Sequence, residues 1–176
     1  PALQAKGVSQ IDHLILTHTD DDHVGDFVTL ADKIKIKEVC VTPGELTCPD
    51  FIKKLKQAKV SIHVLKVGDK IPIFDSSLDV LSNGYTHHGD NNDSVITYGN
   101  FYGTHFLFTG DLEKKGELEL LKQYPTLKVD VLKAGHHGSN TSSAPEFINA
   151  IQPKIALISV GKNTRYGHPN QETLVT

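Results

Sequence analysis

The 176-residue sequence contains no methionine and no tryptophan, and it has only two cysteines. Without a methionine, residue 1 is not a translation start, so we expect the chain to be a fragment of a longer protein. Two cysteines cannot form a disulfide framework, and neither Cys40 nor Cys48 belongs to a CxxC pair. We interpret Cys40 as a buried thiol, with a Cys40–Cys48 disulfide as the alternative.

The sequence also lacks a long apolar run and a strong net charge. No run approaches the length of about 18 residues that a membrane helix needs, and no secretory signal opens the chain. The net charge of −3 excludes a strongly basic nucleic-acid-binding module. Nucleic acid is still open as a substrate, because metal ions offset acidic ligands locally. With 38% hydrophobic and 22% charged residues, the sequence predicts one folded domain over residues 1–176.

Strand-like and helix-like segments alternate along the chain. Helices are expected at both ends, and the middle is rich in strands, which predicts a layered α/β fold. The expected strands are 14–17, 38–42, 61–67, 71–74, 78–82, 94–98, 105–109, 129–133 and 155–160. The expected helices are 26–34, 49–59, 113–124, 145–151 and one that begins at residue 171.

Histidine and aspartate gather directly after predicted strands. The segment 18–23 reads HTDDDH, and His or Asp also follows later strands in the segments 110–111, 136–139 and 166–169. Imidazole and carboxylate groups are common ligands of divalent metals, and loops at strand ends are where α/β proteins place ligands. The four segments therefore predict a metal site, with an acidic surface loop as the alternative for 18–23.

These motifs, in this order, resemble those of the metallo-β-lactamase superfamily. The segments are HxDxDH at 18–23, GD at 110–111, HHGS at 136–139 and YGHP at 166–169. The strings NNDS at 91–94 and VLKAGHHGS at 131–139 resemble, more narrowly, the metallo-β-lactamase-like domain of ComEC-type DNA-uptake competence proteins. The resemblance implies an αββα sandwich with metals at one edge of the two sheets. The superfamily's N-terminal strands are expected to be absent here.

The resemblance also implies a ligand set for two divalent ions. One ion would be held by His18 and Asp20, and the other by Asp22, His23 and His168. Asp111 would bridge the two ions. Asp20 and the segment 91–94 stand where the superfamily usually has histidines, and oxygen donors favour Mn²⁺ over Zn²⁺. We therefore expect two divalent ions, Mn²⁺ or Zn²⁺.

Such a pair of ions would supply an activated water for hydrolysis, with Asp22 and Asp111 as catalytic ligands. A further catalytic group should protonate the leaving oxygen, and His136 or His137 is the candidate. The resemblance implies that this histidine stands beside the metals rather than on them, and the sequence leaves open which of the two it is. A structural hydrogen bond is the alternative role for His136.

Four polar residues beside these loops are candidates for substrate binding, because phosphate contacts use such groups. A solvated rim is the alternative for them. They are Lys133, Ser139, Asn163 and Arg165.

The resemblance implies a metal-dependent nuclease domain of a DNA-uptake competence protein. Its partners would be DNA, in single-stranded form, and the membrane channel portion of the same parent protein, with the oligomeric state left open. The domain would lie on the extracytoplasmic side of the cell membrane. Two alternatives are a stand-alone metallo-hydrolase acting on another ester-like substrate and a catalytically weak DNA-binding module.

Overall fold

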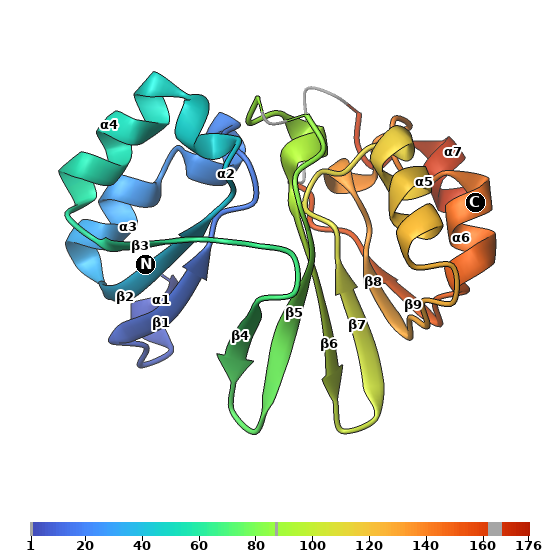
Figure 1. Ribbon diagram of the computed structural model, residues 1–176, viewed down its shortest axis with the longest axis horizontal. Helices are drawn as coiled ribbons and strands as arrows, with labels where there is room; N and C mark the ends of the chain where they lie inside the picture. Colours follow the sequence, from blue (N-terminus) through green and yellow to red (C-terminus); the bar gives the residue numbers. More distant parts are fainter. Residues whose placement is uncertain (1, 87, 162–166) are drawn as a thin grey trace.

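The fold is an αββα sandwich, as expected from the sequence. A computed structural model describes residues 2–86, 88–161 and 167–176. Two β-sheets stand face to face, and helices cover the outer side of each sheet (Figure 1). No helix in these ranges is long and apolar enough to cross a membrane.

The first sheet has three parallel strands in the order β1-β2-β3. The strands are β1 (Gln10–Ile15), β2 (Lys35–Val41) and β3 (Ser61–Val64), and the helices of this half are α1 (Ala2–Ala5), α2 (Asp21–Val24), α3 (Phe27–Lys33) and α4 (Pro49–Ala58). Helices α3 and α4 bury Phe27, Phe51 and Leu55 against Val39 and Val41. Parallel strands need crossover segments of this kind, so the helices return the chain to the same end of the sheet.

The second sheet has six strands in the order β4 to β9. They are β4 (Lys70–Ile73), β5 (Ser76–Asn83), β6 (Val95–Phe101), β7 (Thr104–Phe108), β8 (Val131–Lys133) and β9 (Ile155–Leu157). Strands β4 to β7 pair antiparallel, whereas β7, β8 and β9 pair parallel. Its remaining elements are α5 (Lys114–Gln123), α6 (Pro145–Ile151), α7 (Gln171–Val175) and the 3₁₀ turns η2 (Asn91–Asp93) and η3 (His136–Gly138), while the turn η1 (Glu45–Thr47) precedes α4.

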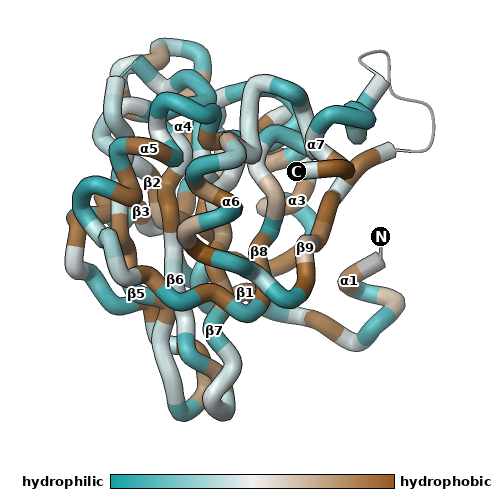
Figure 2. The backbone as a smooth tube through the Cα atoms, turned by 90° about the vertical axis from the view of Figure 1, so that its right-hand side faces the viewer, coloured by the Kyte–Doolittle hydropathy of each residue, from teal (hydrophilic) through white to brown (hydrophobic). Residues whose placement is uncertain are grey.

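Three apolar clusters hold the layers together. Phe147 and Leu120 are buried between the second sheet and its helices, and Figure 2 shows brown, apolar stretches along β8 and β9 beside α6. Between the two sheets, Cys40 packs against Leu65 and Val80. Cys40 is buried as expected, and both cysteines are free thiols, so the disulfide alternative is wrong.

The strand boundaries differ from the sequence expectation at several places, including the start of β1 and the end of β9. β1 begins at Gln10 rather than at residue 14, because Gln10 and His13 pair in register with β2 although they are polar. β9 ends at Leu157 rather than at residue 160. It is an edge strand with β8 as its one neighbour in the described sheet, and Ile155 and Leu157 are about half exposed.

A buried glutamate on α5 ties the loop after η3 to the second helix layer. Glu117 is 1% exposed, and its two carboxyl oxygens accept the backbone N–H groups of Ser143 and Ala144 at 2.8 and 2.7 Å. These donors lie at the start of α6, where a carboxylate is electrostatically favoured. The contact therefore fixes the far end of the loop that carries η3.

We expect Glu117→Gln to lower the free energy of unfolding by about 1–3 kcal/mol, because the amide NH₂ would face a backbone N–H donor and leave it unpaired. Urea unfolding measures this change. Glu119→Gln on the same helix is the matched control, since the Glu119 side chain is partly exposed and pairs with Lys122. Its effect should be within about 0.5 kcal/mol. Equal effects of the two substitutions would contradict the role assigned to Glu117.

Candidate metal centre

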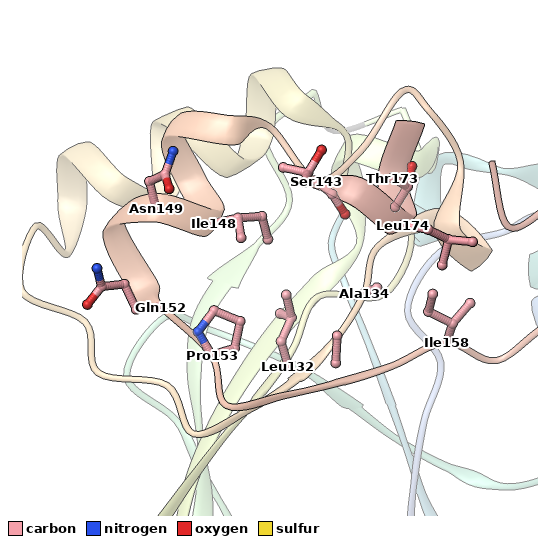
Figure 3. Close-up of a pocket in the computed structure, with 12 residues that line it drawn as sticks. Leu132, Ala134, Ser143, Ile148, Asn149, Gln152, Pro153, Ile158, Thr173 and Leu174 are labelled. Atoms are coloured by element: carbon pink, nitrogen blue, oxygen red, sulfur yellow. The ribbon is translucent and has the colours of Figure 1, made fainter. Parts of the chain in front are cut away.

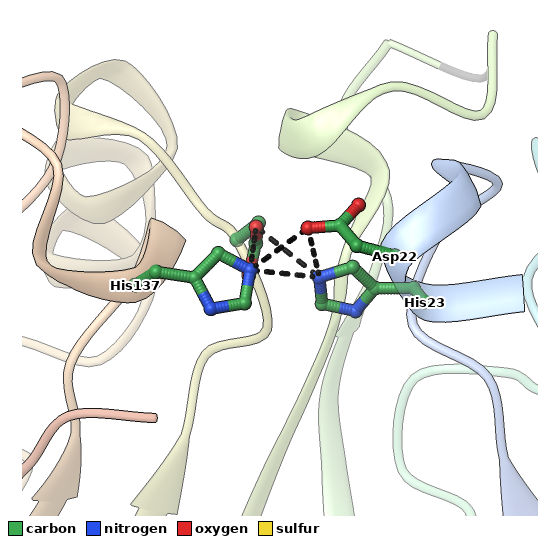
Figure 4. A group of neighbouring side chains, drawn as sticks. Asp22, His23 and His137 are labelled. Carbon is green, nitrogen blue, oxygen red and sulfur yellow. Dashed lines mark hydrogen bonds and ion pairs between the residues drawn. The ribbon is translucent and has the colours of Figure 1, made fainter. Parts of the chain in front are cut away.

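Four potential metal ligands from three separate segments of the chain converge at one edge of the two sheets. Asp22 and His23 come from α2, Asp111 follows β7, and His137 comes from η3 after β8. Figure 4 shows the rings of His23 and His137 with ring nitrogens facing each other beside the Asp22 carboxylate. The structure thus brings together segments that are far apart in the sequence, as the strand-end pattern predicted.

The spacing of these four groups fits a single metal ion. Asp111 Oδ2 lies 3.2 Å from His23 Nε2 and 3.3 Å from His137 Nε2. The two Nε2 atoms lie 3.3 Å apart, and Asp22 Oδ2 is 3.1 Å from His137 Nε2 and 3.9 Å from that of His23. Two donors on one tetrahedral ion with bonds of about 2.0 Å lie about 3.3 Å apart. The side chains already have this spacing.

Hydrogen bonds on the other ring nitrogens fix the two histidines in this orientation. His137 Nδ1 lies 2.7 Å from the carbonyl oxygen of Ser159, which can only accept, so Nδ1 carries the proton. Its Nε2 therefore presents a lone pair, which is the form that binds a metal. His23 Nδ1 lies 3.2 Å from the hydroxyl of Thr17. The same hydroxyl lies 3.0 Å from His18 Nδ1.

Asp111 is the most enclosed of the four ligands. It is 2% exposed, and its backbone N–H donates to Ser94 Oγ at 2.9 Å. Burial opposes its ionisation, but the hydrogen bond with His23 and the charge of Lys133 outweigh this effect and hold the pKa of Asp111 below its usual range. Gly110 has φ +56°, and a Cβ there would lie 2.6 Å from Ser94 Oγ. A glycine is therefore required at the turn that presents Asp111.

His18 and Asp20 form a second donor pair beside the first group. His18 is fully buried, and its Nε2 has no hydrogen-bond partner in the described part of the chain. That nitrogen lies 3.7 Å from Asp20 Oδ2. Burial, reinforced by the charge of His23, lowers the pKa of His18 to about 4, so the ring is neutral near pH 7. An unpaired buried lone pair that faces a carboxylate fits a second cation, because both groups can then act as ligands.

One residue of the expected ligand set, His168, is not among the four ligands of the cluster, but it lines the same cavity as Asp22 and Asp111, so its role as a ligand stays a prediction. His168 was expected to complete the set of Asp22 and His23, but the structure places His137 there. The ring of His168 lies against that of His136, with centroids 5.8 Å apart. His137 was expected to stand beside the metals rather than among their ligands. The reason for the difference is the carbonyl of Ser159, which turns His137 Nε2 into the cluster.

Two of the expected substrate-binding residues, Lys133 and Ser139, make contacts within the chain. Lys133 Nζ donates to the carbonyl of Gly110 at 2.6 Å and lies 3.4 Å from Asp111 Oδ1, so it supports the ligand turn instead of projecting to a substrate. Ser139 is 3% exposed, and its hydroxyl is hydrogen-bonded to Thr141 at 3.1 Å. Asn163 and Arg165 lie outside the described residues, and their role stays a prediction.

The segment 91–94 supports the site without joining the ligand cluster. The Asp93 carboxylate is buried and accepts the backbone N–H groups of Thr86 and Gly89 at 2.7 and 2.6 Å. Ser94 Oγ lies 3.4 Å from His18 Nδ1, the nitrogen that faces away from Asp20. Ser94 therefore orients His18, whereas Asp93 holds the loop that precedes η2.

The ligand cluster opens into a cavity of about 830 Å³. The residues that line it are Asp20, Asp21, Asp22, Asp111, His136, His137, Ser139, Asn140, His168 and Asn170. A second cavity, of about 560 Å³, lies among β8, β9, α6 and α7 (Figure 3). The side chains that line it include Leu132, Ile148 and Leu174 but no titratable group. Of these two cavities, the polar one carries the groups needed for acid–base and metal chemistry.

Most of the chain matches one known protein family. The model of the metallo-beta-lactamase superfamily matches residues 1–162. The chain belongs to this superfamily. Within it, the chain is similar to "ComE operon protein 3" of Bacillus subtilis, with 43% identity over 99% of the chain, and to "Competence protein ComA" of Neisseria gonorrhoeae, with 32% identity over 97%. It spans 23% of the length of each relative.

Solved structures with low sequence identity to this chain agree on the fold. CmlA, a diiron beta-hydroxylase from Streptomyces venezuelae, aligns with a TM-score of 0.60 at 14% identity, over 95% of this chain and 40% of its own. The Rm3 metallo-beta-lactamase aligns with a TM-score of 0.55 at 11% identity, over 85% of this chain and 74% of its own. The chain is thus a hydrolase-like domain of the metallo-beta-lactamase superfamily that is related to ComEC-type competence proteins, as its motifs suggested.

Sequence reasoning missed two groups that orient the site. The hydroxyl of Thr17 contacts both His18 and His23, and the carbonyl of Ser159 fixes His137. The position of Thr17, directly before the HxDxDH motif, was the one available signal for it. A backbone carbonyl leaves no signal in a sequence.

Proposed function

We propose that this domain hydrolyses the phosphodiester backbone of DNA with the help of bound divalent metal ions. The observation that carries the proposal is the four-ligand cluster of Asp22, His23, Asp111 and His137, with the donor pair of His18 and Asp20 beside it. The cluster mixes imidazole and carboxylate donors, which suits Mn²⁺ or Zn²⁺. Both donor sets border the cavity described above.

The residues that line the cavity have separate roles in the proposed hydrolysis. Divalent ions bound here would activate a water molecule and stabilise the charge that grows on the phosphate. His136 lines the cavity, and its Nδ1 is held by Thr141 Oγ1 at 3.0 Å. We assign to its other ring nitrogen, Nε2, the role of donating a proton to the leaving oxygen. Asn140 and Asn170 line the same cavity, and their amides can donate to phosphate oxygens.

The relatives supply the biological setting of the proposal. Their names include "Competence protein ComA" and "Recombination protein 2" of Haemophilus influenzae, the latter 26% identical over 99% of this chain. We infer that the domain acts on incoming DNA, in single-stranded form, during DNA uptake. In this setting it would lie on the extracytoplasmic side of the membrane, beside the channel portion of the same parent protein.

The test is cleavage of end-labelled single-stranded and double-stranded DNA by the full chain with Mn²⁺, Mg²⁺ or Zn²⁺. We expect metal-dependent cleavage of single strands that stops with a chelator and is absent in Asp111→Ala. Metal bound in the stoichiometry of at least two ions without any cleavage would favour another ester-like substrate. Binding of single-stranded DNA without product would favour a DNA-binding module. Either outcome would overturn the proposal.

A further inference from the structure

A second group of metal-ligating side chains lies on the first sheet, below the strand ends that carry the cluster described above. His13 on β1 is in register with Glu38 on β2, and Cys40 on β2 is in register with His63 on β3. Partners in register project to the same face of a sheet, as do residues two apart on one strand. Cys40 packs into the core between the two sheets. The whole row therefore lies on the face of the first sheet that packs toward the second sheet.

The donor atoms of this row are close enough to share one ion. Glu38 Oε2 lies 3.2 Å from His13 Nδ1 and 3.6 Å from His63 Nδ1. The donor atoms of His13, Glu38 and Cys40 all lie within 4.8 Å of one another. Cys40 is 1% exposed, whereas the side chains of His13 and Glu38 are 27% and 30% exposed. The thiol thus forms the floor of the group, and solvent reaches it from the side of the histidine.

His63 lies between the carboxylates of Asp69 and Glu38, and a neutral ring can donate a hydrogen bond to only one of them. Asp69 Oδ2 lies 3.1 Å from His63 Nε2 and also accepts the backbone N–H of Lys66 at 2.8 Å. A neutral His63 that donates to Asp69 presents its Nδ1 lone pair to Glu38 Oε2. Two lone pairs at this distance repel each other. A cation bound at Glu38, or a proton on the ring, removes the repulsion.

We propose that His13, Glu38 and Cys40 form a second metal site, with His63 and Asp69 enclosing it from the side of β3. Nitrogen, oxygen and thiolate donors together select a borderline ion such as Zn²⁺ over Mg²⁺ or Mn²⁺. Bound there, the ion would join β1 to β2 across the sheet. The site is independent of the proposed hydrolysis, because it shares no residue with the cluster at the strand ends.

The thiol gives the site a property that the main cluster lacks. Burial, with the charges of Glu38 and Asp69, raises the pKa of the Cys40 thiol to about 11, so the metal-free thiol keeps its proton. Binding of an ion would release this proton to solvent and form a metal–thiolate bond. The main cluster offers only imidazole and carboxylate donors. A metal–thiolate signal therefore reports the second site alone.

The experiment is a titration of the full chain with Co²⁺, which replaces Zn²⁺ and gives a thiolate-to-cobalt charge-transfer band in the near ultraviolet. We expect the band in the unmodified chain and its loss in Cys40→Ser. Cys40 is buried, so its replacement can unfold the chain. The decisive variant is therefore His13→Gln, because the His13 side chain is partly exposed. His13→Gln should raise the cobalt concentration at half-saturation by at least about tenfold.

Two substitutions serve as controls. Cys48→Ser removes the other thiol, and His105→Gln removes a histidine that pairs with Asp130 on the other sheet. Both should leave the band and its midpoint unchanged. The proposal is overturned if the unmodified chain gives no band, if Cys48→Ser removes the band, or if His13→Gln and His105→Gln behave alike. In each case the row is a hydrogen-bond network without a metal.

Discussion

Replacing His137 by alanine is expected to lower both the bound metal and the cleavage of DNA, whereas His136→Ala should lower cleavage alone. His137 Nε2 lies within 3.3 Å of three other potential ligands, so its loss opens the cluster. Even residues that only orient a ligand change metal affinity or activity about 10- to 100-fold, and loss of a ligand should exceed that range. Loss of a proton donor at His136 should slow cleavage by about 10²- to 10⁴-fold.

The two histidines form a matched pair. They are neighbours in the chain, and both adopt left-handed backbone conformations, with φ of 45° and 52°. Alanine therefore meets comparable backbone strain at either position. Metal content after dialysis, measured beside the cleavage rate, separates the two roles. A loss of metal in His136→Ala with normal metal in His137→Ala would show that the assignments are reversed.

The ordered motifs allowed the fold and the location of the site to be predicted. Asp111 and His137 follow the neighbouring parallel strands β7 and β8, whose carboxyl ends share one edge of the second sheet, and His23 lies on α2, which follows β1 of the first sheet. The apolar faces of the predicted helices were likewise sufficient to place Phe51 and Leu55 against the first sheet. Such features follow from local sequence because periodicity and strand ends are local properties.

The inner arrangement of the site was not predictable in the same way. Which of His136 and His137 enters the cluster depends on the carbonyl of Ser159, 22 residues away from His137. Lys133 was read as a substrate contact because it stands beside the motif, yet its ammonium group is committed to Gly110 and Asp111. Side-chain direction at these positions is decided by tertiary contacts. Motif spacing carries no information about such contacts.

A buried carboxyl outside the motifs should make the stability of the domain depend on pH. Glu45 is fully buried, and its Oε2 accepts the backbone N–H of Thr42. Its Oε1 has no hydrogen-bond partner within the described ranges. Burial, offset in part by the hydrogen bonds with Thr42, raises the pKa of Glu45 to about 8 from its ordinary value of 4.5. The folded chain therefore keeps a proton that the unfolded chain loses between these two pH values.

Because the folded pKa is the higher one, the stability that neutral Glu45 contributes is complete below about pH 4.5 and is lost as the pH rises toward 8. Each pH unit in this window costs at most about 1.4 kcal/mol. Glu45→Gln keeps the shape and an acceptor for Thr42 but cannot ionise. We expect the variant to match the unmodified chain near pH 5 and to exceed its free energy of unfolding by about 2–4 kcal/mol at pH 8.

Urea unfolding at several pH values, with a chelator present, measures this difference. The chelator removes the pH dependence of metal binding. The titration of Glu117, whose pKa burial raises to about 7, is common to both proteins and cancels in the comparison. Glu146→Gln, at an exposed position on α6, is the control and should give a small difference that does not change with pH. A difference between Glu45→Gln and the unmodified chain that stays constant from pH 5 to 8 would contradict a neutral buried Glu45.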